Sequence, residues 1–146
     1  MAALSHLSAS LHVIDALDVQ TLALFVSTDG RPLRGAAGLV DWRLCGALSA
    51  SIQGGGFRGG LGERLLMPTQ GRIGPERLLI YGCGPSSRPF TAEELTSCLD
   101  AARRAGADEL AIELPEALAD GALDALRGFS GKRLVVLGAE AGAQPR

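Results

Sequence analysis

Hydrophobic residues along the chain gather in short runs separated by Gly, Pro and polar residues. Residues 21–27 (TLALFVS) are a continuous apolar run, which is typical of a strand covered on both faces. Several other short runs have a similar character and are bounded by turn residues. We expect further strands at residues 11–18, 65–68, 77–81, 109–114 and 133–137.

Three longer segments have the spacing of helices. Between residues 37 and 53 apolar residues recur every four positions, which places them on one buried stripe of a helix. A second helix begins with a capping box, in which Thr91 is the N-cap and Glu94 follows three residues later. Gly106 supplies its left-handed C-terminal stop. The third predicted helix covers residues 116–128.

The order of these elements predicts the fold class. Strand, helix, strand, helix and strand follow one another in the second half, which favours parallel strands joined by right-handed crossovers. We expect a three-layer α/β domain with a mixed, mostly parallel six-stranded sheet and helices on both faces. Residues 1–146 are predicted to form a single domain, with residues 1–10 and 138–146 as flexible tails.

The charge of the chain is unevenly distributed. The formal net charge is -2, but residues 31–90 hold eight arginines against three acidic residues, a net charge of +5. Residues 91–131 hold nine acidic residues against three arginines, a net charge of −6. The basic segment either attracts a phosphate or an acidic partner or consists of solvated arginines. The acidic total and the lack of interleaved aromatic residues argue against nucleic-acid binding.

Other features of the composition indicate a cytoplasmic protein that holds no metal. No apolar run approaches the length of a membrane span, and the N-terminus lacks the pattern of a secretory signal. The three cysteines lie far apart without metal-ligand spacing, which favours reduced thiols. His6 and His12 have no recognisable nucleophile or orienting carboxylate. We therefore predict no catalytic residues, no metal and no cofactor.

Two glycine clusters suggest different roles. Gly54, Gly55 and Gly56 follow a helix and precede a strand, the wrong order for a phosphate-binding loop. We interpret this cluster as architectural. The second cluster follows an apolar strand and precedes a capped helix, where open α/β sheets bind ligands. The candidate ligand-binding residues, for a nucleotide or ADP-ribose type of ligand, are Gly82, Cys83, Gly84, Ser86, Ser87 and Arg88.

The only tryptophan provides a candidate protein interface. Trp42 lies roughly opposite the buried stripe of its predicted helix, beside Leu39. This arrangement indicates either a helix buried on two sides or an exposed aromatic patch for a protein partner or a second copy of the chain.

The order of motifs from residue 37 onward resembles a known family. The segments "LVDWRLCGALSASI", "GGFRGGLGERLLMPTQG" and "ERLLIYGCG" are similar to the N-terminal domain of the leucyl (cytosol) aminopeptidase family. The likeness extends over about residues 25–137 and implies a macro-domain-like fold. Arg58, Gly59 and Gly60 stand where the family often has lysines, and Cys83 replaces a common leucine.

The resemblance transfers no catalytic residues to this chain. The family's metal ligands and catalytic lysine lie in a C-terminal domain around a motif of the form NTDAEGRL, which does not occur here. We therefore expect a non-catalytic, stand-alone domain that acts in protein interaction, assembly or regulation. The alternatives are a nucleotide- or ADP-ribose-binding domain, and a fragment or subunit of a metal-dependent aminopeptidase.

Overall fold

The protein is described by a computed structural model that covers residues 2–138. Six strands form one sheet: β1 (Ala3–Leu7), β2 (Thr21–Ser27), β3 (Arg64–Pro68), β4 (Arg77–Gly84), β5 (Glu109–Glu113) and β6 (Arg133–Leu137). The helices are α1 (Leu11–Ala16), α2 (Gly35–Arg43), α3 (Ala47–Gln53), α4 (Ala92–Arg104) and a 3₁₀-helix, η1 (Ala122–Gly128).

The strands are arranged in the order β1-β6-β5-β2-β4-β3. All neighbouring pairs are parallel except β3 and β4, which are antiparallel. Side chains of β2 alternate between two apolar clusters, because successive residues of a strand point to opposite faces. Leu22, Leu24 and Val26 pack with α1, α2 and α3, whereas Ala23 and Phe25 pack with α4 and η1.

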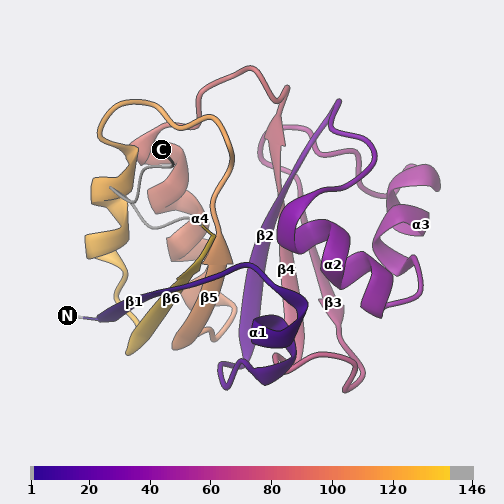
Figure 1. The fold of residues 1–146 in the computed structure, drawn as a ribbon. Coiled ribbons are helices and arrows are strands. Elements are labelled where there is room, and N and C mark those ends of the chain that lie inside the picture. The colour runs from indigo at the N-terminus through magenta and orange to yellow at the C-terminus, as the bar shows by residue number, and fades with distance from the viewer. Residues whose placement is uncertain (1, 139–146) are drawn as a thin grey trace, which may run out of the picture.

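Figure 1 shows α2 and α3 on a different side of the sheet from α4 and η1. The expected fold class, a mixed and mostly parallel six-stranded sheet between two helical layers, is confirmed. The capping box of α4 is also present, since Thr91 accepts from the amide of Glu94 and Glu94 accepts from the amide of Thr91.

The N-terminal segment differs from the expectation. Residues 1–10 are predicted to be a flexible tail, yet Ala3–Leu7 form β1 and pair in parallel with β6. The prediction was wrong because this edge strand has mainly exposed side chains and is held by backbone pairing with a distant part of the chain. The predicted tail at residues 138–146 lies outside the described residues except for Gly138.

The predicted strand at residues 11–18 is also wrong. Residues 11–16 form helix α1, and the Ser10 hydroxyl caps it by accepting from the amide of Val13. Ile14 is its buried anchor. A helix of six residues, less than two turns, presents too few positions to distinguish period 3.6 from period 2, and this explains the misassignment.

Two predicted helices are shorter than expected. The helix at residues 37–53 is broken into α2 and α3, since Cys45 and Gly46 both have positive φ angles, of 56° and 82°. The helix at residues 116–128 is reduced to η1. Its first part is extended instead, because the amides of Phe90 and Ala119 bond to the carbonyls of Ala117 and Phe90 respectively.

Candidate functional site

A cleft of about 1230 Å³ opens at the carboxyl ends of β2, β4, β5 and β6. The last residues of these strands, or those that follow them, line it: Ser27, Cys83, Glu113 and Leu137. Open α/β sheets bind ligands at this edge. Phe25 also lines the cleft and is half-buried, where it stacks on Tyr81 with the ring centroids 5.5 Å apart.

The backbone donors of the second glycine cluster are occupied by the first glycine-rich loop. The amide of Gly84 donates to the carbonyl of Gly59 at 2.9 Å, and the amide of Gly82 donates to the carbonyl of Glu63 at 2.9 Å. Phe57 of the same loop is buried in the apolar cluster that contains α2 and α3 residues and so anchors the loop. These two amides are therefore engaged within the protein instead of facing the cleft as ligand donors.

Cys83 and Ser87 lie in different surroundings. The Cys83 side chain is buried against Phe90 and Tyr81 in the α4 cluster while it lines the cleft. Burial raises the pKa of its thiol, so the thiol is protonated at neutral pH. Ser87 is exposed and lies outside the lining of the cleft.

Ser86 lies in the cleft but already has an anionic partner. Its amide donates to Asp29 Oδ1 at 2.9 Å, and its hydroxyl donates to Oδ2 at 3.0 Å. These hydrogen bonds to Ser86 lower the pKa of Asp29. The carboxylate of Asp29 thus engages both the amide and the hydroxyl of Ser86.

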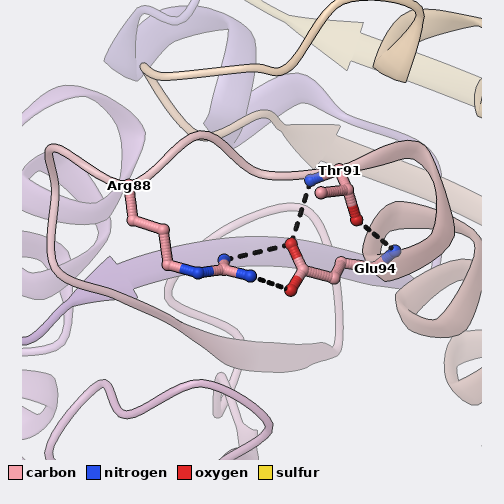
Figure 2. A network of polar contacts seen from close by, with 3 residues as sticks. All are labelled: Arg88, Thr91 and Glu94. Carbon is pink, nitrogen blue, oxygen red and sulfur yellow. Dashed lines mark hydrogen bonds and ion pairs between the residues drawn. The ribbon is translucent and has the colours of Figure 1, made fainter.

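Arg88 is also paired with a carboxylate of the protein, that of Glu94. Figure 2 shows its guanidinium forming two hydrogen bonds with the Glu94 carboxylate, one of them 3.0 Å long. The same carboxylate accepts from the amide of Thr91. The bond to Arg88 is the main cause that lowers the pKa of Glu94. The predicted phosphate-binding arginine therefore fixes the loop before α4 to the first turn of that helix.

Glu113 is a residue of the cleft that the sequence reasoning missed. Its two carboxylate oxygens lie 3.1 and 2.9 Å from the amide nitrogen of Ala36, at the start of α2. Gly35 has a φ of 59°, and a β-carbon there would lie 2.7 Å from Glu113 Oε2. Desolvation is the main cause that raises the pKa of Glu113, against the lowering effect of the Ala36 and Ala37 amides.

The three carboxylates share one consequence for the cleft. Asp29, Glu94 and Glu113 each accept a hydrogen bond from a donor in or beside the cleft, namely Ser86, Arg88 and Ala36, so these donors are engaged within the protein. The only sequence signal for Glu113 was its position at the end of a buried strand, before Leu114 and Pro115. That position does not indicate a partner 77 residues earlier in the chain.

A separate surface surrounds Trp42, a residue that is 67% exposed. The guanidinium of Arg43 lies over its ring, 5.3 Å from the centroid. Arg43 is held by Asp15 through two hydrogen bonds and an ion pair. Leu39, the other predicted interface residue, is partly buried against the core.

A shallow hollow adjoins Trp42. Trp42 and Arg43 line it with Gly38, Cys45, Gly46 and Arg72. Asp41 also borders the hollow, but its carboxylate accepts from the amides of Leu48 and Ser49 and caps α3. We call the surface formed by Trp42, Arg43, Cys45 and Arg72 the Trp42 surface.

Within residues 2–138, no three His, Cys, Asp or Glu side chains gather closely enough to hold a metal ion. None of the helices in the same range combines the length and apolar character needed to cross a membrane.

The model of the cytosol aminopeptidase family, N-terminal domain, matches residues 22–137. The chain belongs to this family. The resemblance inferred from the sequence motifs is therefore confirmed. A comparison with curated protein sequences found no match.

Solved structures agree with the fold of a cytosol aminopeptidase N-terminal domain. A mutant of tomato leucine aminopeptidase matches with a TM-score of 0.66 and 16% sequence identity, over 94% of this chain and 32% of the tomato chain. The chain thus spans about a third of that enzyme's length.

Two macrodomains share the fold over nearly their whole length. The macrodomain of Mycobacterium tuberculosis DarG matches with a TM-score of 0.66 and 14% identity, over 96% of this chain and 100% of its own. The macrodomain of Thermus aquaticus DarG matches with a TM-score of 0.65 and 15% identity, over 94% and 99% respectively. At these identities the similarity shows that this chain has a macro-domain-like fold.

Proposed function

We propose that this N-terminal-type domain is a non-catalytic protein-contact module, and that its contact surface is the Trp42 surface. The observation that carries the proposal is the exposure of Trp42, which is 67% exposed. Tryptophan and arginine are enriched at the energetic centres of protein interfaces. Here both residue types lie side by side around one shallow hollow.

The Trp42 surface is also preorganised. Asp15 holds Arg43, and Arg43 lies over the indole ring, so the ring has a cation stacked on it before any partner arrives. A side chain that is already held loses less conformational entropy on binding. This arrangement supports a contact role better than a purely structural one, since Trp42 contributes little to the buried core.

The cleft supports the non-catalytic part of the proposal. Its carboxylates Asp29 and Glu113 accept hydrogen bonds from Ser86 and Ala36, and Arg88 is paired with Glu94. Groups that are hydrogen-bonded within the protein stabilise loops and helix starts, and they are not free to bind a substrate. A cytoplasmic location is part of the proposal and is supported by three free cysteines, Cys45, Cys83 and Cys98.

The test is site-specific photo-crosslinking in the native cell. A benzophenone amino acid replaces Trp42, and the matched control carries it in place of Leu66, an apolar residue that is 52% exposed on β3. The proposal predicts a discrete adduct from position 42 that the control lacks. If position 42 gives no adduct, or the same adducts as position 66, the Trp42 surface is not a contact surface.

One observation favours a second candidate, a nucleotide or ADP-ribose type of ligand. The cleft lies where α/β sheets bind ligands, and Phe25 offers a partly exposed ring on which a base could stack. The three internal carboxylates weigh against it, since a phosphate would have to displace them. Titration calorimetry with ADP-ribose tests this candidate, and the absence of heat at millimolar ligand would remove it.

The length comparison favours a third candidate, a subunit or part of a metal-dependent aminopeptidase. The chain spans 32% of the tomato enzyme. In this case the Trp42 surface would contact the catalytic part. An assay with manganese and leucine p-nitroanilide tests whether the chain has activity of its own, and this candidate predicts hydrolysis only after a catalytic chain is added.

A further inference from the structure

We infer that β1 is a second protein-contact site, at which an extended, uncharged segment of a different protein adds to the sheet as a seventh strand. β1 is the last strand at one end of the sheet and, among the described residues, pairs only with β6. Figure 1 shows β1 beside β6 at this end. Addition of a strand to an exposed sheet edge is a recurring mode of peptide recognition. No residue of β1 belongs to the Trp42 surface, so this site is independent of the proposed function.

The outer edge of β1 presents unpartnered backbone groups at Leu4 and His6. The amide of Ala3 and the carbonyl of Leu7 bond to the residues that flank β6, at 3.1 and 2.9 Å. Alternate residues of a strand bond to the same neighbour, so Ala3, Ser5 and Leu7 face β6. The N–H and C=O groups of Leu4 and His6 therefore point away from the sheet. Within residues 2–138 they have no hydrogen-bond partner.

β1 lacks the features that protect the other edge of the sheet. β3, at the opposite edge, contains Arg64 and Pro68, and charged residues and proline keep edge strands from pairing with other chains. The sequence of β1, ALSHL, contains no Lys, Arg, Asp, Glu or Pro. Its two leucines are exposed on opposite faces, Leu4 at 47% and Leu7 at 43%. An edge of this kind is a template for an added strand.

The cleft beside β1 determines which side chains the added strand should carry. Leu4 and His6 line the cleft, as does Leu123 of η1, another exposed apolar residue. We expect antiparallel addition, which is slightly more stable per residue than parallel pairing. Residues directly opposite Leu4 and His6 would then share their face of the sheet and point toward the cleft. The lining holds four arginines and four acidic residues, so it has no net charge that would select a charged segment. The occupant should therefore carry apolar, β-branched residues at alternate positions.

Hydrogen exchange of the backbone amides provides the first experimental signature. In the free protein the amides of Leu4 and His6 should exchange at least tenfold faster than those of Ser5 and Leu7, which face β6. Equal exchange of all four amides would overturn the inference. Equally slow exchange would mean that the edge is already paired, for example with a second copy, and equally fast exchange would mean that β1 is not formed.

A blocked pentapeptide is the probe for the added strand. In acetyl-Thr-Val-Thr-Val-Thr-amide, the two valines can lie opposite Leu4 and His6 and exchange backbone hydrogen bonds with both. Titration with millimolar peptide should shift the amide resonances of Leu4 and His6 saturably. Methylation of both valine amides removes the donors that face β1 and should weaken binding at least tenfold. The matched control carries two methyl groups on threonine amides, which face away from β1, and should bind like the unmodified peptide.

Two substitutions at one position test the edge from the side of the protein. Leu4→Pro removes an N–H that faces away from β6, so the sheet keeps its own hydrogen bonds while the added strand loses one and meets the proline ring. This variant should bind the peptide at least tenfold more weakly. Leu4→Val keeps the N–H and should bind within about twofold of the unchanged protein. Circular dichroism establishes that each variant is folded. If Leu4→Pro unfolds, the two methylated peptides decide the question on the unchanged protein.

The outcomes separate the β1 site from the proposed function. The absence of saturable shifts at Leu4 and His6, or equal binding of the two methylated peptides, overturns the β1 site and leaves the Trp42 surface as proposed. Shifts centred on Leu66 of β3 would place the peptide on the opposite edge and also overturn it. Failure of the crosslink from position 42, together with shifts at Leu4 and His6, would instead remove the Trp42 surface and support the β1 site.

Discussion

Gly82 and Gly60 lie with backbone against backbone: a β-carbon at Gly82 would stand 2.0 Å from the carbonyl oxygen of Gly60. The same β-carbon would lie 2.6 Å from the carbonyl carbon of Gly59. The second glycine cluster therefore packs on Gly59 and Gly60, in the loop that follows the first cluster. Their glycines bring two backbone segments into contact and leave less polar backbone for a ligand.

This packing predicts that adding one methyl group at Gly82 has a large effect on the free energy of unfolding. Gly82→Ala should lower the free energy of unfolding by about 3 kcal/mol, since the obstructing atoms are backbone and cannot rotate away. Gly128→Ala is the matched control, because a β-carbon there would have no neighbour within 4 Å. Urea denaturation of both variants measures the difference. Equal stability of the two variants would contradict the close approach.

The Glu113 cap should show a pH dependence. The pKa of Glu113 is raised in the folded protein, so the native state holds this proton more tightly than the unfolded chain does. Its contribution to the free energy of unfolding therefore falls as the pH rises from the ordinary glutamate pKa, 4.5, through the folded value. Above that value the buried carboxylate is ionised at a desolvation cost.

Glu113→Gln isolates this effect, because glutamine keeps an acceptor oxygen for Ala36 but does not titrate. The free energy of unfolding of Glu113→Gln minus that of the unchanged protein should increase between pH 4 and pH 7. Other carboxyl groups, including Asp15 and Glu94, titrate in both proteins and cancel. Urea denaturation at several pH values measures this difference, and a constant difference across that range would count against a raised pKa for Glu113.

The three thiols should differ in reactivity. Burial raises the pKa of Cys98 to about 12 and also raises the pKa of Cys83, whereas Cys45 is exposed beside Arg72. Thiolates, not thiols, attack disulfide reagents. Ellman's reagent at pH 8 should therefore titrate one thiol at least tenfold faster than the other two. Cys45→Ser should remove the fast phase; its persistence in that variant would assign it to a buried cysteine.

The network in Figure 2 predicts a difference between two neighbouring glutamates. Glu94 accepts from Thr91 and binds Arg88, whereas Glu93 is exposed. Glu94→Ala should lower the free energy of unfolding by about 1 kcal/mol, the usual effect of losing a helix cap, and Glu93→Ala by much less. Thermal unfolding of the two variants measures this difference. Equal losses would mean that the capping box adds nothing in solution.

The elements with strong local signals were predicted from the sequence. The apolar runs gave β2, β4, β5 and β6, and the capping box with Gly106 gave the bounds of α4. β1 was not predictable because its exposed side chains carry no apolar pattern and its pairing with β6 joins opposite ends of the chain. The break between α2 and α3 depends on positive φ at Cys45, which is uncommon for a residue other than glycine.

The candidate sites were predictable only in part. Of the residues predicted from sequence order, Cys83, Ser86 and Arg88 line the cleft, whereas Gly82, Gly84 and Ser87 lie outside its lining. The sequence could not show that Asp29 accepts a hydrogen bond from Ser86, or that Glu94 accepts one from Arg88. Both pairings depend on the fold. For the helix carrying Trp42, the sequence left burial and exposure open, and the structure has the ring exposed and Leu39 partly buried.

Acrylamide quenching of Trp42 fluorescence tests the central claim most directly, because Trp42 is the only tryptophan of the chain. In dilute, monomeric protein the ring should be quenched freely, as expected from its 67% exposure. In the assembled or partner-bound protein we predict a several-fold lower quenching constant, with emission shifted to the blue. Equal quenching of the free and the associated protein would show that Trp42 stays in solvent and would contradict the account.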